Sequence, residues 1–222
     1  MSVTDPRRVA GLYQDTRQRI VALLDDHGDA TWGAPVPACP GWSVGDVVAH
    51  LVAVAEDWVT GTLAGAPTDE QTAEHVRRFA GHDRAELLAR WAAAGAELCR
   101  RAEVDGLIAP VGDVTSHEHD IRGALGRPGE RGSEAVRYSS DQVLTRLDTS
   151  LPLCVTVEDA DYRCGPDAEP ELRLSTTRFE ALRWRTGRRS RSQILAMDWS
   201  ADPTPILGEL CLFGPATADL IE

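Results

Sequence analysis

The chain has 222 residues, of which 42% are hydrophobic and 26% charged, as in a globular protein with one large domain or two small ones. No apolar run approaches the roughly 20 residues of a membrane-spanning helix, and the N-terminal segment lacks the apolar core of a signal peptide, so we expect a cytoplasmic protein without a membrane partner. The formal net charge of −12, from 35 acidic and 23 basic residues, argues against a nucleic-acid partner, because an anionic surface repels phosphate backbones.

The first part of the chain has the hydrophobic pattern of helices only. In residues 6–26 the apolar side chains recur at the i, i+3, i+4 spacing of an amphipathic helix. Ser43 and Asp46 form an S-x-x-D pattern, close to a capping box, that predicts the start of a strongly apolar helix ending near Gly65. Three more helical segments are predicted, at residues 69–79, 84–102 and 112–125. We therefore expect a helical domain over residues 1–131.

The remaining residues, 132–222, mix helical and strand patterns. The segment LCVTVEDADYRC is rich in strand formers and ELRLSTT alternates apolar with polar residues, which is typical of strands. Short helices are predicted at residues 139–148, 177–184, 190–197 and 206–212. The predicted fold class is therefore α+β, with a helical bundle followed by a small α/β domain.

The segment GDVTSHEHD places several potential metal ligands in one helix. Asp113 precedes His117 by four residues and Asp120 follows it by three, so all three side chains share one helical stripe, whereas His119 points elsewhere. Such a spacing also occurs in ordinary ion pairs and hydrogen bonds. A metal site is therefore one of two open interpretations of this segment.

A third candidate ligand, His50, lies within the apolar run VVAHLVAV. A buried imidazole needs a partner, which can be a metal or a hydrogen-bonding group. If His50 faces the helix of Asp113 and His117, the three form a divalent-metal site with a fourth position open for water or substrate. Asp46, four residues before His50, and Asp120 would then orient the two histidine rings.

Three segments in this chain resemble the mycothiol-dependent maleylpyruvate isomerase family, within the wider DinB-like superfamily. They are ACPGWSVGDVVAHLVAVAEDW, DVTSHEHDIRGALGRPG, and RFEALRWRTGRRSRSQI followed by DWSADP. The resemblance implies an up-down four-helix DinB-like bundle and a sterol-carrier-like C-terminal domain. It also implies that His50, Asp113 and His117 bind a divalent metal, for which zinc is the expected ion. Asp113 stands where the family has glutamate.

The resemblance further implies mycothiol as a low-molecular-weight thiol cosubstrate. A metal-bound thiolate would attack a small electrophile, giving an isomerase or a thiol S-transferase. Two alternatives stay open: a non-catalytic binding or regulatory protein on the same scaffold, and a zinc hydrolase that uses metal-bound water. The sequence does not indicate the oligomeric state.

Five arginines lie in residues 183–191, against the acidic background of the chain. This stretch is either a solvated turn or an anion clamp, since a guanidinium can hold a carboxylate bidentately. We assign Arg183, Arg185 and Arg188 as candidate substrate-binding residues. Their assignment is a hypothesis from residue type alone.

The five cysteines are odd in number, widely spaced and without a C-x-x-C pair, which argues against disulfides. Cys39, beside the Pro-Gly turn before His50, is either a nucleophile or ligand or a residue packed in the turn, and packing is the commoner role. For Trp42 we expect packing at the end of the bundle rather than contact with a ligand.

Overall fold

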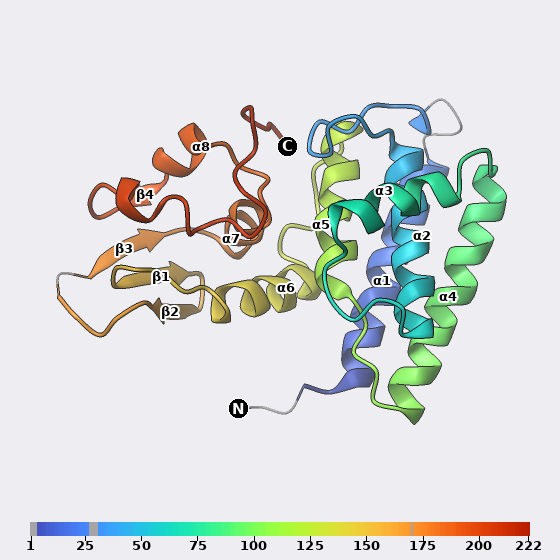
Figure 1. The fold of residues 1–222 in the computed structure, drawn as a ribbon, viewed down its shortest axis with the longest axis horizontal. Coiled ribbons are helices and arrows are strands. Elements are labelled where there is room, and N and C mark those ends of the chain that lie inside the picture. The colour runs from blue at the N-terminus through green and yellow to red at the C-terminus, as the bar shows by residue number, and fades with distance from the viewer. Residues whose placement is uncertain (1–3, 27–30, 170) are drawn as a thin grey trace. The chain divides into compact units, whose positions relative to one another are not determined.

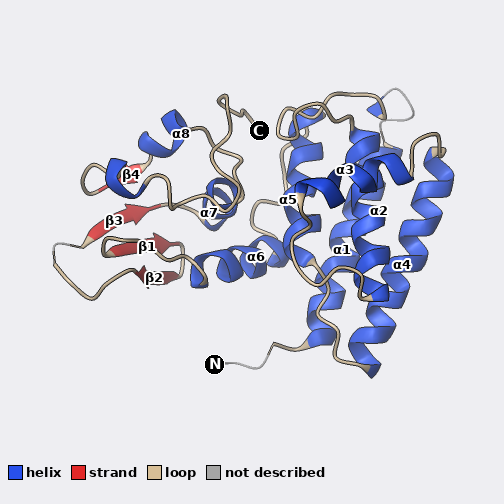
Figure 2. Cartoon of the chain, viewed as in Figure 1, coloured by secondary structure: helices blue, strands red, loops and turns tan. Residues whose placement is uncertain are grey.

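The computed structural model describes residues 4–26, 31–169 and 171–222 of the chain (Figures 1 and 2). The chain divides into two compact units, Met1–Pro128 together with Glu222, and Gly129–Ile221. The sequence placed the domain boundary at residue 131, three residues after Pro128. Among the described residues, no helix is long and apolar enough to cross a membrane.

The N-terminal unit is a helical bundle. Helices α1 and α2 each pack against both α4 and α5, and α3 packs against α2. Figure 1 shows that α1 and α5 run in one direction while α2 and α4 run in the other, because the chain returns along α2 through α3 before α4 begins. The helices are α1 (Pro6–Asp25), α2 (Val44–Thr60), α3 (Asp69–Arg78), α4 (Arg84–Val104) and α5 (Val111–Ala124).

Local sequence signals set the ends of helix α2. Ser43 and Asp46 make a full capping box, with each side chain bound to the other residue's backbone N–H. The helix ends at Thr60 because Gly61 takes the left-handed conformation at φ +77°, which glycine adopts without a Cβ clash. The sequence had placed this end near Gly65, and the earlier of the two glycines is the one that ends the helix.

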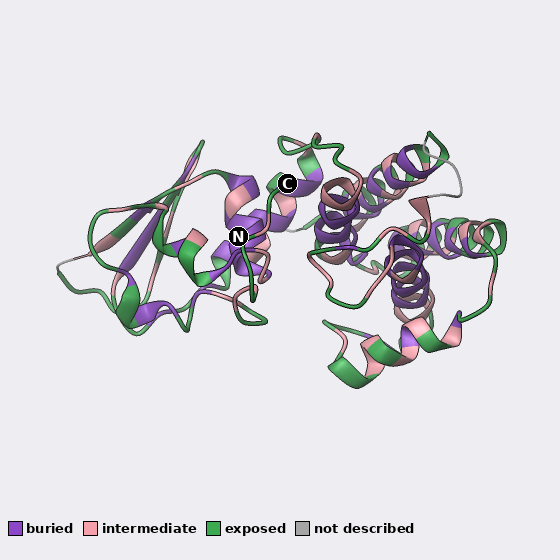
Figure 3. Ribbon diagram, turned by 90° about the horizontal axis from the view of Figure 1, so that it is seen from above, coloured by how far each residue is buried: buried purple, intermediate pink, exposed green. Residues whose placement is uncertain are grey.

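The bundle core contains a polar contact between two large aromatic side chains. Trp91 on α4 donates from Nε1 to the hydroxyl of Tyr13 on α1 at 2.8 Å, and both residues are buried. Burial raises the pKa of Tyr13 well above its usual value, so the phenol is neutral. Figure 3 shows that the buried residues of the bundle lie on the faces that the helices turn toward one another.

The C-terminal unit is an α+β fold built on a four-stranded sheet in the order β2-β1-β3-β4. Strand β1 pairs antiparallel with β2 and parallel with β3, and β3 pairs antiparallel with β4. Helices α6 and α7 pack together, and an apolar cluster that includes Val155, Leu174 and Trp184 forms the core. The elements are α6 (Glu134–Thr145), β1 (Leu153–Val157), β2 (Ala160–Cys164), β3 (Leu172–Ser175), α7 (Arg178–Arg185), α8 (Arg191–Leu195) and β4 (Asp198–Trp199).

Two expectations for this unit were wrong in their bounds. The helix expected at 139–148 begins five residues earlier, because Ser133 caps it by accepting from the N–H of Val136. The helix expected at 206–212 is a 3-10 turn at Thr204–Ile206, in a segment interrupted by Pro203 and Pro205. Strand β4, only two residues long, was not predicted.

We predict that Tyr13→Phe lowers the free energy of unfolding by about 1–3 kcal/mol, because the buried Nε1–H of Trp91 then loses its acceptor. Urea unfolding followed by circular dichroism measures the change. A stability equal to that of the wild type would show that Trp91 finds another acceptor in the bundle core.

Candidate metal centre

The three predicted ligands come together at the interface of α2 and α5. His50 lies on α2, and Asp113 and His117 lie one turn apart on α5. Asp113 Oδ1 is 3.5 Å from His50 Nε2 and 3.7 Å from His117 Nε2, and one potential ligand atom of each residue lies within 4.8 Å of the others. Both histidines are buried, while the side chain of Asp113 is 26% exposed. The cluster therefore has a solvent-facing side at Asp113.

On the far side of His117, its second ring nitrogen is bound by a carboxylate. His117 Nδ1 is 2.9 Å from Asp120 Oδ2, and the Asp120 side chain is fully buried. The thiol of Cys39 lies 3.4 Å from the same carboxylate oxygen and 3.8 Å from His117 Nδ1. Asp120 thus contacts His117 as the sequence suggested, and Cys39 packs against this pair from the loop before α2.

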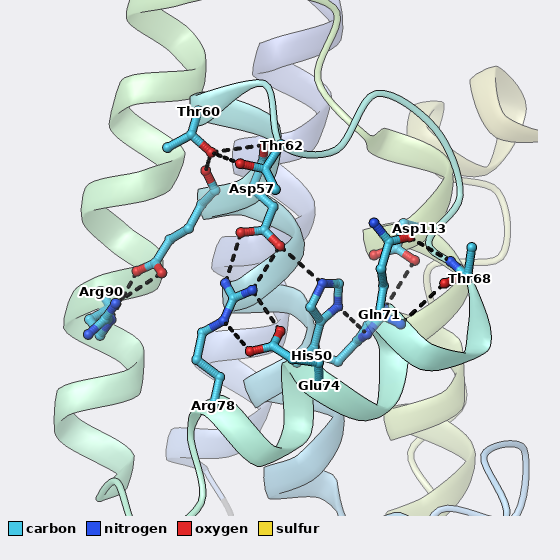
Figure 4. Close-up of polar contacts among 12 residues, drawn as sticks. His50, Asp57, Thr60, Thr62, Thr68, Gln71, Glu74, Arg78, Arg90 and Asp113 are labelled. Atoms are coloured by element: carbon cyan, nitrogen blue, oxygen red, sulfur yellow. Dashed lines mark hydrogen bonds and ion pairs between the residues drawn. The ribbon is translucent and has the colours of Figure 1, made fainter.

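The second ring nitrogen of His50 meets another histidine. His50 Nδ1 is 3.3 Å from Nδ1 of His75, a buried residue of α3. His75 Nε2 is 3.1 Å from Asp57 Oδ2, and Arg78 binds both oxygens of Asp57 at 2.8 and 3.0 Å. Figure 4 shows Asp57 beside Arg78, with Glu74 on the other side of the guanidinium.

The electrostatics of this network follow from burial and ion pairing. Burial lowers the pKa of His75, and nearby His50 lowers it further against the opposing pull of Asp57. Hydrogen bonds to Asp57 and Glu74 raise the pKa of Arg78, which stays a cation. The hydrogen bond from Arg78 lowers the pKa of Glu74. At neutral pH the network therefore combines a neutral imidazole at His75 with an ion-paired arginine.

These donors fit a divalent ion such as zinc. Ligand atoms about 2.0–2.1 Å from a tetrahedral zinc lie roughly 3.3–3.5 Å from one another. The two distances from Asp113 Oδ1, 3.5 and 3.7 Å, are close to that spacing. Two imidazoles and one carboxylate are a common catalytic zinc set, and the second nitrogen of each ring is held by a hydrogen bond, as is usual for histidine ligands.

Trp42 lies against the cluster, which the sequence did not lead us to expect. Its ring centroid is 5.3 Å from that of His50 and 6.4 Å from that of His117, with the latter pair stacked at 22°. The tryptophan is half-buried. It therefore shields the histidine rings from solvent on one side and restricts their rotation.

The role predicted for Asp46 was wrong. Asp46 Oδ2 accepts from the backbone N–H and the hydroxyl of Ser43 at 2.8 and 2.7 Å. That geometry turns the carboxylate back toward the start of α2, away from the ring that lies one turn further on. Among the described residues, His75 is the hydrogen-bond partner of His50 Nδ1.

Two of the three candidate substrate-binding arginines, Arg183 and Arg185, lie inside the C-terminal unit rather than in a solvated turn. Arg183 is fully buried in the C-terminal unit, and Arg185 is 3% exposed and donates to the carbonyls of Val143 and Leu210. Burial lowers the pKa of Arg185. Arg188 is half-buried and donates to the carbonyl of Thr186 at 2.7 Å. A substrate-binding role for Arg188 stays a prediction.

His75 and Asp57 were missed by the sequence analysis. The two residues are 18 positions apart and lie on different helices, so no intrahelical spacing links them. The sequence around His75 gave no signal of its role, because Glu74 and Arg78 flank it in a charged helical segment, and nothing in such a segment indicates a buried histidine.

The fold and the cluster define a helical-bundle protein with a candidate metal centre of two histidines and one aspartate between facing helices. A family model described as the mycothiol maleylpyruvate isomerase N-terminal domain matches residues 13–127, more than half of the chain and nearly all of the bundle. The chain belongs to this family. A comparison with curated proteins gives no significant match.

Solved structures with a similar fold include a crystal structure of the mycothiol-dependent maleylpyruvate isomerase. The likeness has a TM-score of 0.52 at 16% identity and covers 92% of this chain and 94% of that one. A mutant of that isomerase with one histidine replaced by alanine gives the same values. At this identity the likeness establishes the fold, and it takes in residues of both units.

We predict that Asp46→Ala lowers the free energy of unfolding by about 1 kcal/mol, because it removes half of the capping box of α2. Zinc affinity, measured by titration of the metal-free protein, should stay at the wild-type value. Ser43→Ala removes the other half of the same box and is the matched control. If Asp46 did orient His50, its loss would instead weaken zinc binding by about tenfold or more, and Ser43→Ala would not.

Proposed function

We propose that this chain is a mycothiol-dependent metalloenzyme of the isomerase or thiol S-transferase type. The observation that carries the proposal is the approach of two imidazole Nε2 atoms, from different helices, to the single carboxylate oxygen of Asp113. Membership of the mycothiol maleylpyruvate isomerase family supports an enzyme and supports mycothiol as the thiol. The thiol cosubstrate and a small electrophile are the partners that this proposal implies.

In the proposed site His50, Asp113 and His117 hold the ion. A divalent metal at this position supplies a positive charge that lowers the pKa of a bound thiol and favours its nucleophilic thiolate form. Asp120 holds the ring of His117 in place through Nδ1, and Trp42 limits access of water to both rings. The partial exposure of Asp113 leaves a side on which the thiol and the electrophile can approach.

Two reaction outcomes are compatible with such a site. In an isomerase the thiolate adds to an unsaturated carbon, the former double bond rotates, and elimination returns the thiol with an isomer of the substrate. In an S-transferase the sulfur stays bonded to carbon. After addition the resulting carbanion takes up a proton, and after substitution a leaving group departs from the attacked carbon. Maleylpyruvate, on which the structural relative acts by name, is the first electrophile to test.

The first prediction from this proposal concerns bound metal. The purified chain should hold about one zinc per molecule after reconstitution, and His117→Ala should hold at least tenfold less, because the substitution removes one of three ligands. His82→Ala is the matched control, since His82 is paired with Glu86 outside the cluster. Elemental analysis of the protein after gel filtration gives the metal content.

An absence of bound zinc in the reconstituted wild type would contradict the metalloenzyme proposal and favour a binding protein on an inherited scaffold. Equal zinc in wild type and His117→Ala would contradict the assignment of this cluster. Zinc bound elsewhere in the protein would remain bound in both His117→Ala and His82→Ala.

The second prediction concerns the thiol. Turnover of maleylpyruvate, or of another unsaturated acid that the enzyme accepts, should require mycothiol and saturate with it. Asp113→Asn should lower kcat/KM by at least about tenfold, since loss of a direct ligand exceeds the effect of losing an outer hydrogen-bond partner. Chromatography of the products distinguishes an isomer from a thioether. Hydrolysis of esters or amides by the zinc-loaded protein without mycothiol would instead favour the zinc hydrolase.

A further inference from the structure

We propose that His75, held by Asp57, is a positioning residue that fixes His50 as the tautomer whose Nε2 lone pair faces Asp113. The proposal rests on the proposed function only for its consequence, which is tighter metal binding by His50. The tautomer itself is a property of the metal-free chain. Helix α3 thereby becomes part of the candidate metal centre, although it supplies none of the three ligands.

The argument begins at Arg78. A guanidinium has only N–H donors, and Arg78 uses two of its nitrogens on the two oxygens of Asp57. The ion pair makes Asp57 a carboxylate that accepts hydrogen bonds and donates none. The nitrogen facing Asp57 Oδ2, His75 Nε2 at 3.1 Å, must therefore carry the proton and donate it.

The next step follows from the two nitrogens of one neutral imidazole. A neutral histidine has one N–H donor and one acceptor nitrogen, so His75 Nδ1 is an acceptor when Nε2 is the donor. His75 is 1% exposed, and burial disfavours the doubly protonated ring that would have two donors. The atom 3.3 Å from His75 Nδ1 is His50 Nδ1, which must then be the donor.

The last step concerns the metal-facing atom. With its proton on Nδ1, neutral His50 has a bare lone pair on Nε2, and that atom lies 3.5 Å from Asp113 Oδ1. Only a nitrogen with a free lone pair can bind a metal ion. If the proton sat on Nε2 instead, His50 could not serve as a ligand until it changed tautomer. The hydrogen bonds that link Arg78, Asp57 and His75 thus fix the Nδ1–H tautomer of His50 before any ion binds.

His117 shows the same outcome by a shorter route. Its Nδ1 faces Asp120 Oδ2 directly at 2.9 Å, so Nδ1 donates and Nε2 is again left toward Asp113. In His50 a second imidazole stands between the ring and the carboxylate. The carboxylate, Asp57, comes from the last turns of α2 itself, and α3 brings His75 between Asp57 and His50.

The direct test is the tautomer of His50 in the metal-free full-length protein. Long-range proton–nitrogen correlation spectra of ¹⁵N-histidine-labelled protein distinguish the two neutral tautomers, and His50→Gln assigns the signal. We expect the Nδ1–H tautomer of His50 in the wild type at pH 7.5. In His75→Phe, which keeps a ring but has no nitrogen, the Nε2–H tautomer should become populated. A wild-type His50 that is predominantly Nε2–H would overturn the proposal.

Zinc affinity gives the second readout. His75→Phe should weaken zinc binding about 10- to 100-fold, the usual effect of losing an outer partner of a histidine ligand. His75→Asn, whose side-chain oxygen can accept from His50 Nδ1 near the place of the lost imidazole nitrogen, should recover part of that loss. Arg77→Gln on the same helix is the matched control, because Arg77 is exposed and outside the series from Arg78 to His50, and it should bind zinc as the wild type does.

The outcomes separate this inference from the proposed function. An equal affinity in His75→Phe and Arg77→Gln, with an unchanged His50 tautomer, would refute the positioning role while the metal centre stood. A wild type that binds no zinc but shows the Nδ1–H tautomer, lost in His75→Phe, would refute the metalloenzyme and support the hydrogen-bond chain. Thermal unfolding of each variant shows whether a change in affinity comes with a loss of fold.

Discussion

Helix α5 buries six consecutive polar residues, 115–120, and the bundle must satisfy them inside its core, because an unpaired buried polar group is strongly destabilising. The hydroxyls of Thr115 and Ser116 bond back to carbonyls of the first turn. Glu118 has a fully buried side chain and is held by Arg19 of α1 and by Arg122. His117 contacts the buried carboxylate of Asp120 and, together with Asp113, meets His50 of α2. The polar composition of α5 thus requires both neighbouring helices to present charged or hydrogen-bonding groups to it, and a metal centre is one arrangement that meets the requirement.

The rings of His50 and His117 must both keep Nε2 available to a metal, and their Nδ1 atoms have different hydrogen-bond partners. In the proposed arrangement each ring donates from Nδ1 and so leaves Nε2 free: His117 donates to the carboxylate of Asp120, and His50 donates to His75, which in turn donates to Asp57. Helix α3, which runs across α2 and packs against it, supplies the histidine of the indirect route (Figure 1). Such a series of hydrogen bonds makes the orientation of His50 depend on the packing of a short helix whose one buried residue is His75. The candidate site therefore depends on elements that carry none of its ligands.

Much of the bundle could be predicted from spacing within single helices, whereas the grouping of His50 with two residues of another helix rested on the family resemblance. The stripe Asp113–His117–Asp120 is a property of α5 alone, and its contacts follow the predicted intervals. Asp46 also had the right spacing to His50, but the same side chain formed the capping box, and the cap determined its direction. The link from Asp57 to His75 could not be predicted, since it depends on which face of α3 packs on α2. The burial of the arginines of α7 could not be predicted for a similar reason, because it depends on how the helix packs in the C-terminal unit.

The shorter side chain at position 113 was the feature of the sequence that favoured a scaffold without a metal. Aspartate is one methylene shorter than the glutamate that the sequence resemblance leads one to expect here, so its carboxylate reaches less far from the helix toward the facing histidine. In this bundle α5 packs directly on α2, and Asp113 Oδ1 lies at nearly equal distances, 3.5 and 3.7 Å, from the two Nε2 atoms. The position in the first turn of α5 also suits a carboxylate, because the positive end of the helix dipole stabilises its charge there. The shorter carboxylate thus still reaches both histidines in this bundle, so an aspartate at position 113 is by itself no reason to prefer a non-catalytic scaffold over a metal-binding enzyme.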